Sequence, residues 1–239
     1  MTRTAITLST LFALYTTTAS AGPCLTLGVF TGGGPDHHLD AVEKMVATGR
    51  FDTVQLFGRY QLSAMQHVDV TMMAWSSAPP DLHSPERGVV GDAIAAYIEA
   101  GGGVLITQNA LSRGVAPSGG FSQYQPMYSV SNCPYYEPDA LQLDVPAEDP
   151  LFAGIDSLSM SLYTRTSCME FGIADDAILH ASFEDGRPFV VSMGSVVAIN
   201  VYFASTDAHP DRTGPGYPES RNSLIREPFQ IQQFLVHSR

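Results

Sequence analysis

A helix followed by three glycines and a buried strand forms the clearest hydrophobic pattern in the chain. Four apolar residues recur at the three- and four-residue intervals of a helix face: Val90, Ile94, Tyr97 and Ile98. The glycines of Gly101–Gly103 can take the left-handed conformation that ends a helix. Val104–Thr107 is then a short apolar run, typical of the centre of a parallel sheet. The pattern predicts a helix packed on a central strand, with polar Gln108 and Asn109 directly after that strand.

Shorter apolar runs predict three strands before this helix: Leu25–Phe30, Thr53–Phe57 and Val70–Trp75. Helical spacing lies between them, around Leu39–Val46 and Leu62–Val68. Ser84 and Pro85 suit the start of the long helix, because serine caps a helix and proline fits its first position. Strands alternating with helices predict parallel pairing through right-handed crossovers.

The pattern changes between Ser112 and Asp139, where glycines and prolines interrupt every period. Four tyrosines lie in this stretch: Tyr124, Tyr128, Tyr135 and Tyr136. Long loops inside a compact domain are uncommon, and they are usually functional lids or mobile segments. The simpler alternative is a tyrosine-rich loop packed over the sheet.

The carboxyl-terminal part predicts hairpins. A strand is expected at Leu141–Val145, and Ile178–Phe183 and Phe189–Met193 flank an Asp-Gly turn. Val196–Ala204 is a long and nearly unbroken apolar run, which favours a central strand. Glu227–Val236 predicts a closing helix.

The amino terminus predicts export. Arg3 precedes the apolar stretch Ala5–Tyr15, and Ala19-Ser20-Ala21 has the small-residue pattern of signal-peptidase cleavage. We therefore expect residues 1–21 to be a signal peptide and residues 22–239 to form one secreted or periplasmic domain. The apolar stretch is too short to span a bilayer, which needs about 20 residues.

Charge and cysteines narrow the class of protein further. The chain has 12 Lys and Arg against 24 Asp and Glu, a net charge of −12, which argues against nucleic acid and anionic membranes as partners. Its three cysteines allow one disulfide and one free thiol in an oxidising compartment. A bridge between Cys133 and Cys168 is the first choice, with Cys24 left over, and three unpaired thiols are the alternative.

Five segments resemble one protein superfamily in their order and spacing: GVFTGGGPDHH, AAYIEAGGGVLITQNA, EDPLFAGID, HASFEDGRPFVVSM and SVVAINVYFASTDA. The chain is similar over these segments to the class I glutamine amidotransferase-like superfamily, and within it to the ThuA-like (trehalose-utilisation-like) branch. The resemblance, with the strand pattern, implies an α/β fold: a flavodoxin-like three-layer sandwich. Its central sheet should be mostly parallel, with antiparallel hairpin strands in the carboxyl-terminal part.

One departure from the superfamily changes the expected chemistry. Its amidotransferases carry a nucleophilic cysteine in a Gly-x-Cys-x-Gly turn after the strand equivalent to Val104–Thr107. In this chain the turn is Thr107-Gln108-Asn109-Ala110-Leu111, and no His–Glu pair matches those that activate the nucleophile. The sequence therefore predicts a domain without glutaminase activity and without a cofactor.

Polar residues follow the predicted strands at the ends where a ligand crevice is expected in such folds. The candidate ligand-binding residues are Asp36, His37, His38, Gln108, Asn109, Asp207 and His209. Histidines and carboxylates can bind zinc or act as acid and base, but their spacing matches no compact zinc motif, and no metal site is predicted. Loops at strand ends are also polar for no functional reason.

Three functions remain open from the sequence. The first is an exported ThuA-like domain that binds a small polar ligand such as a carbohydrate. The second is a hydrolase that uses Asp or His groups at the strand ends, with or without a metal. The third is a catalytically inactive interaction domain that docks through the tyrosine-rich stretch. The sequence leaves the oligomeric state open.

Overall fold

The computed structural model describes residues 25–30, 42, 45–46, 51–57, 62–74, 86–111, 116–131, 139–144, 159–162, 170–183 and 185–200. The predicted signal peptide, the predicted closing helix and the three cysteines lie outside these residues, as do Ser84 and Pro85. None of the described helices has the length and apolar character needed to cross a membrane.

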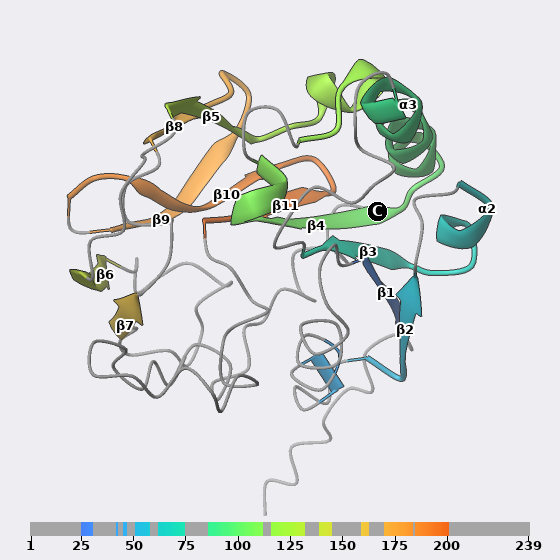
Figure 1. Ribbon diagram of the computed structural model, residues 1–239, viewed down its shortest axis with the longest axis horizontal. Helices are drawn as coiled ribbons and strands as arrows, with labels where there is room; N and C mark the ends of the chain where they lie inside the picture. The colour runs from blue at the N-terminus through green and yellow to red at the C-terminus, as the bar shows by residue number, and fades with distance from the viewer. Residues whose placement is uncertain are drawn as a thin grey trace, which may run out of the picture.

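Nine of the described strands form one sheet in the order β2-β1-β3-β4-β11-β10-β9-β6-β7 (Figure 1). Their bounds are β1 Thr26–Phe30, β2 Thr53–Phe57, β3 Val70–Met73, β4 Gly103–Thr107, β6 Asp139–Asp144, β7 Ser159–Leu162, β9 Ile178–Phe183, β10 Pro188–Met193 and β11 Val196–Ile199. The strands from β2 to β11 are paired in parallel, whereas all pairs beyond β11 are antiparallel. This arrangement confirms the predicted α/β class, with parallel central strands and antiparallel hairpin strands in the carboxyl-terminal part.

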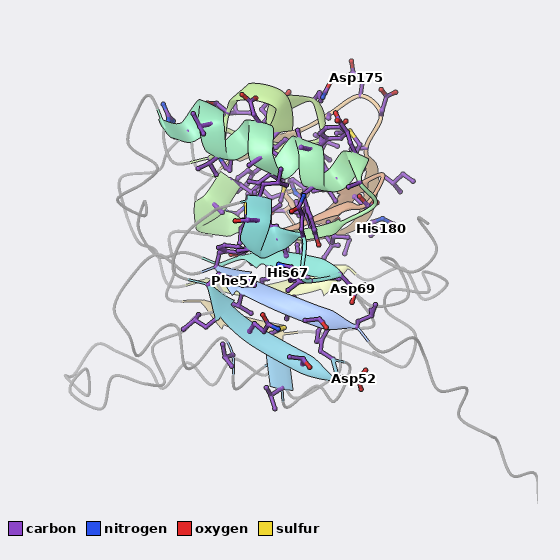
Figure 2. All side chains as sticks on the ribbon, turned by 90° about the vertical axis from the view of Figure 1, so that its right-hand side faces the viewer. Asp52, Phe57, His67, Asp69, Asp175 and His180 are labelled. Carbon is purple, nitrogen blue, oxygen red and sulfur yellow. The ribbon has the colours of Figure 1, made fainter. Side chains whose placement is uncertain are left out.

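Helices cover both faces of the parallel half. Helices α2 (Leu62–Met65) and α3 (Glu86–Glu99) lie together on one face, and Figure 2 shows α3 above the strands. The chain moves along the sheet in one direction from β1 to β2 and in the other from β3 to β4. Right-handed crossovers therefore place the helical residues 45–46 on the face opposite α3, where Met45 is buried.

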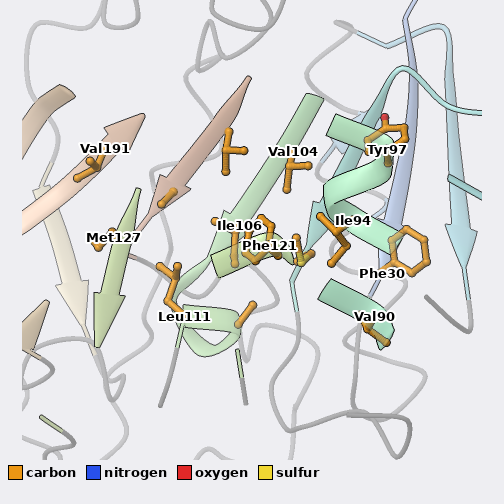
Figure 3. Close-up of a cluster of buried hydrophobic side chains, with 14 of the residues drawn as sticks. Phe30, Val90, Ile94, Tyr97, Val104, Ile106, Leu111, Phe121, Met127 and Val191 are labelled. Atoms are coloured by element: carbon orange, nitrogen blue, oxygen red, sulfur yellow. The ribbon is translucent and has the colours of Figure 1, made fainter. Parts of the chain in front are cut away.

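The core under α3 follows the predicted helix face. Val90, Ile94 and Tyr97 are buried against β4 and its neighbours, as Figure 3 shows. The Tyr97 hydroxyl donates a hydrogen bond to the Val68 carbonyl oxygen at 3.1 Å, so its one polar atom is satisfied inside the core. Periodic apolar residues thus fix which side of α3 faces the sheet.

The glycines after α3 have the two roles that glycine alone can fill. Gly101 has φ +94°, the left-handed conformation that ends the helix. A Cβ on Gly102 would overlap the Tyr97 ring, so the absence of a side chain lets that ring lie on the backbone. The chain then enters β4 at Gly103, one residue before the predicted strand.

The predicted loop Ser112–Asp139 is wrong in part. It contains the 3-10 helix η3 (Gly119–Gln123) and strand β5 (Met127–Ser131), which pairs antiparallel with β8 (Glu170–Ile173). Phe121 and Met127 anchor the segment because both are fully buried in the core. Its glycines permit close packing on α3, where the Gly120 N–H donates to the Asp92 carboxylate at 2.7 Å. These contacts join residues far apart in the chain, so the local spacing of apolar residues could not predict them.

Several boundaries also differ from the sequence prediction. Neither β7 nor β8 was predicted, and β6 begins at Asp139, two residues before the expected strand. The run Val196–Ala204 forms a strand only as far as Ile199 within the described residues, because Asn200 is a bend. Residues 201–204 lie outside those residues. The placement of β11 between β4 and β10 confirms that this strand is central.

Candidate functional site

Four parallel strands end side by side at one edge of the sheet. Phe30 of β1 pairs with Met73 of β3, Met73 pairs with Ile106 of β4, and Ile106 pairs with Ala198 of β11. These four residues form one row across the sheet, and each is the last or the last but one residue of its strand. The ends of β1, β4 and β11, the strands that precede the predicted ligand-binding residues in the chain, therefore lie at this carboxyl edge.

The reversal of strand order does not fall where it was predicted. Leu25–Phe30, Val104–Thr107 and Val196–Ala204 are the most apolar runs of the sequence, which predicts three central strands whose carboxyl ends adjoin at the reversal. In the structure β4 adjoins β11, but β3 separates β1 from β4, and the order reverses between β1 and β3. The reason is that β3 is also fully buried, including the polar Thr71, so it is a central strand as well.

The structure describes two of the seven predicted site residues. Gln108 and Asn109 begin the 3-10 helix η2 (Gln108–Leu111), directly after β4. Ala110 and Leu111 of the same turn are buried in the core, and they hold the turn at the strand end. The other five predicted residues lie outside the described part of the chain: Asp36, His37, His38, Asp207 and His209.

Thr107 has a structural role at this edge. Its hydroxyl donates a hydrogen bond to the Met73 carbonyl oxygen at 3.1 Å, and its side chain is fully buried. This bond ties the end of β4 to β3. The start of η2 is therefore fixed on both sides, by Thr107 before it and by Ala110 and Leu111 within it.

The turn after β4 differs in shape from a nucleophile elbow. In such elbows the nucleophile sits on a sharp, strained turn between strand and helix. Here the chain passes from β4 into a 3-10 turn, and no non-glycine residue in the described ranges has a positive φ. Both the residues Thr107–Leu111 and their backbone thus lack the features that expose a reactive side chain.

Asn200 is a polar residue at this edge that the sequence analysis missed. It follows β11, and because Ile199 pairs with Thr107, Asn200 comes level with Gln108. Its backbone N–H donates to the Phe189 carbonyl at 2.8 Å, and Nδ2 donates to the Pro188 carbonyl at 3.0 Å. The side chain is fully buried, and within the described structure its Oδ1 accepts no hydrogen bond. An asparagine inside an apolar run was the available signal.

The unpartnered Oδ1 matters because a buried acceptor without a donor costs roughly 1–3 kcal/mol. Its side-chain Nδ2 donates to the Pro188 carbonyl and its backbone N–H donates to the Phe189 carbonyl, so both the amide and the backbone of Asn200 are held against β10. Thr71 Oγ1 is also buried and unpartnered among the described residues, but Thr71 lies under α3 in the middle of the sheet. Among the residues that the structure describes, Asn200 alone combines this property with a position at the carboxyl edge.

His180 and Ser192 form a buried polar pair away from this edge. His180 Nε2 and Ser192 Oγ are 2.7 Å apart across β9 and β10. Ser192 pairs with Val197 near the start of β11, which places the contact toward the amino ends of the parallel strands. Both side chains are buried between paired strands, so we assign this hydrogen bond to the interior of the sheet.

Metal ligation has no support in the described residues, where no three His, Cys, Asp or Glu side chains come together. The histidines and carboxylates that the sequence named as possible ligands lie in other parts of the chain. The prediction that the protein has no metal site therefore stays a prediction.

Comparisons with known proteins identify the fold. No protein-family model and no curated protein matches the sequence. Among solved structures, a protein from Bacteroides uniformis described as ThuA-like superposes with a TM-score of 0.55 at 13% identity, covering 94% of this chain and 93% of that one. A glutamine amidotransferase gives 0.54 at 12% identity, covering 89% of this chain and 98% of the other.

PurLQS from Thermotoga maritima is a third similar structure, with a TM-score of 0.53 at 12% identity over 90% of this chain and 98% of that one. The chain therefore has the class I glutamine amidotransferase-like fold, as its sequence motifs indicated. At these identities the likeness concerns the fold. The activity depends on the site, and the turn after β4 has its own residues and shape.

Proposed function

We propose that the protein is an exported, ThuA-like domain that binds a small polar ligand at the carboxyl edge of its parallel strands and does not hydrolyse glutamine. A carbohydrate is the ligand class that the proposal names. The proposed site consists of the residues predicted from the sequence together with Asn200. Of the predicted residues, the structure describes Gln108 and Asn109, both on η2.

The single observation that carries the proposal is the buried Oδ1 of Asn200. It is an acceptor with no donor among the described residues, and its side chain is hydrogen-bonded to β10 at the carboxyl edge. A hydroxyl group is both donor and acceptor, so a polyol can donate to Asn200 and bond to side-chain amides at the same time. Amides also suit a neutral ligand, because they carry no charge that would need a counter-ion.

Ligand binding is testable by thermal shift with a panel of mono- and disaccharides and, separately, divalent cations. We expect at least one sugar to raise the melting temperature of the wild-type protein. The same sugar should fail to shift Asn109→Ala, because the turn directly after β4 would lose one of its two side-chain amides. Binding at a ligand concentration of about 100 times Kd corresponds to about 2.7 kcal/mol of added stability, which is readily measured.

A matched control separates the site from general effects of amide loss. Gln123→Ala removes an exposed side-chain amide from η3, away from the carboxyl edge, and should respond to the sugar as the wild type does. Equal shifts in the wild type and in Asn109→Ala would place the ligand elsewhere and defeat the proposal. A panel in which no sugar shifts the wild type would defeat the choice of carbohydrate.

The cation arm of the same screen tests the hydrolase hypothesis. A divalent cation that stabilises the protein and supports hydrolysis of a sugar substrate would favour that hypothesis over binding alone. The interaction-domain hypothesis concerns the tyrosine-rich stretch, where Tyr128 on β5 is about half exposed. It predicts that no small ligand of the panel binds.

A further inference from the structure

Strand β2 forms an open edge of the main sheet. Among the described strands it pairs with β1 alone, in an unbroken parallel register from Thr26–Thr53 to Phe30–Phe57. Figure 2 looks onto this edge, with β2 in front, Phe57 at one end and Asp52 at the other. Thr53, Gln55 and Leu56 are exposed, and the Leu56 side chain is 46% accessible.

The hydrogen bonds of β1 reveal which backbone groups of β2 face the open side. Thr26 and Phe30 accept hydrogen bonds from the β3 side, from the N–H groups of Asp69 and Ala74. Backbone groups alternate along a parallel strand, so Leu27 and Val29 of β1 face β2. Leu27 lies opposite Val54. It follows that Thr53, Gln55 and Phe57 bond to β1.

Val54 and Leu56 therefore turn their N–H and C=O groups outward. These two residues offer two donors and two acceptors in a row, which is the template that a further strand requires. They also project their side chains to the same face, because residues two apart in a strand share a face. The open edge thus presents a backbone pattern and an apolar surface together.

The edge lacks the features that usually prevent strand pairing. Native edge strands are commonly protected by charged side chains, by proline or by a bulge. The sequence of β2 is TVQLF, with no charge and no proline, and its register with β1 has no bulge. In a chain of net charge −12, an uncharged edge is where two copies approach with least repulsion.

The strand is also self-complementary about Gln55. In an antiparallel pair of two β2 strands centred there, Val54 lies opposite Leu56 of the second copy, and Leu56 lies opposite its Val54. Both are hydrogen-bonded pairs, because these are the residues whose backbone groups face outward. The four apolar side chains then meet on one face, while the two Gln55 residues meet at the two-fold axis. The symmetry is that of an isologous dimer.

We propose that two copies of this chain associate through β2, forming one continuous sheet across a two-fold axis. A five-residue strand with one apolar face buries less than the ~1,200 Å² of a standard interface, so the dimer belongs to the weak, concentration-dependent class. The long-range repulsion between two acidic copies is screened by salt. Association should therefore strengthen as the salt concentration rises, unlike an interface held by ion pairs.

Sedimentation velocity over a range of protein concentrations tests this dimer on the purified protein. We expect a monomer–dimer equilibrium whose dissociation constant falls when NaCl is raised from about 0.05 to about 0.5 M. Leu56→Lys introduces a charge into the apolar face and should raise that constant at least about tenfold. Val54→Pro removes the outward N–H of Val54, which would donate a hydrogen bond to the second copy, and should also weaken the dimer. An edge strand can accept this proline because that N–H does not bond to β1.

The control is Val89→Lys, which adds the same charge at a position on α3 that is 72% exposed. Its dissociation constant should equal that of the wild type. If Val54→Pro unfolds the protein, Leu56→Lys alone decides the outcome. A wild-type protein that stays monomeric at every concentration and salt overturns the proposal, as does a dimer that survives Leu56→Lys unchanged. Neither result bears on ligand binding at the carboxyl edge.

Discussion

Gly88 and Gly91 both lie in the first two turns of α3, but their surroundings in the structure differ. Gly88 and Gly91 each weaken the helix by about 1 kcal/mol relative to alanine in isolation. Around Gly88 the nearest atom to an added Cβ is Ser118 Oγ, at 4.0 Å. A Cβ on Gly91 would instead overlap the Ser118 backbone carbonyl. The first glycine is replaceable, and the second permits the contact between α3 and the segment before η3.

We therefore expect opposite effects from the same substitution at these sites. Gly91→Ala should lower the free energy of unfolding by about 1–3 kcal/mol or more, the usual cost of overpacking. Gly88→Ala should raise it by up to about 1 kcal/mol through helix propensity. Urea denaturation of both variants measures the difference. Equal effects of the two substitutions would contradict the close approach of Ser118 to α3.

At the scale of an element, the β9–β10 hairpin is held at its turn by Asp185 and Arg187. Gly186 has φ +83°, as the Asp-Gly turn signal predicted. The Asp185 carboxylate accepts hydrogen bonds from the Arg187 N–H at 3.1 Å and from its Nε at 2.6 Å, and it forms a salt bridge with the same guanidinium. Arg187 also lies over the Phe183 ring, 5.7 Å from its centre. The turn is thus joined to the aromatic core of the hairpin.

This turn should make stability depend on pH. Burial raises the pKa of the Asp185 carboxyl, but the hydrogen bonds and charge of Arg187 outweigh burial and lower the pKa below its ordinary 3.8. A lowered folded-state pKa stabilises the protein above the unfolded-state pKa, and this stability is lost as the pH falls through the folded value. Asp185→Asn should cost about 0.5 kcal/mol at neutral pH, because the Asp185 carboxylate is exposed and water screens its interaction with Arg187.

Urea denaturation at a series of pH values measures this effect. The difference between the wild type and Asp185→Asn should shrink toward zero as the pH falls below about 4, where the carboxyl becomes protonated. Asp175→Asn, at an exposed position in the turn before β9, serves as the control and should show no such pattern. A difference that stays constant with pH would exclude the ion pair as its cause.

At the scale of the whole molecule, the chain has the fold of glutamine amidotransferases, but we do not expect it to hydrolyse glutamine. Similar solved structures include a glutamine amidotransferase, yet the turn after β4 offers Thr107-Gln108-Asn109-Ala110-Leu111 in a 3-10 conformation. No side chain there can form a thioester. The purified protein should release no glutamate from glutamine, with an active amidotransferase as the positive control. Glutaminase activity that disappears on replacing Cys133 or Cys168 would contradict this and relocate the active site.

The sequence by itself determined the strands and the long helix of the parallel half, but not the order of its strands. The apolar face of α3, the glycines that end it and the strand β4 depend on residues close together in the chain, so local spacing predicts them. The same holds for β2, predicted with its correct bounds, and for the β9–β10 hairpin with its Asp-Gly turn. Periodicity and turn conformations are properties of neighbouring residues, and they need no knowledge of tertiary contacts.

Tertiary structure alone decided what distant segments do to one another. It paired β5 with β8 inside a stretch predicted as a loop, and it distinguished Gly91 from Gly88 through the carbonyl of Ser118. It ended β11 at Ile199 and thereby brought Asn200 level with the end of β4. It also left β2 at an open edge. Each outcome depends on which residues far apart in the chain become neighbours, and the free energy of those contacts does not exist until the sheet has formed.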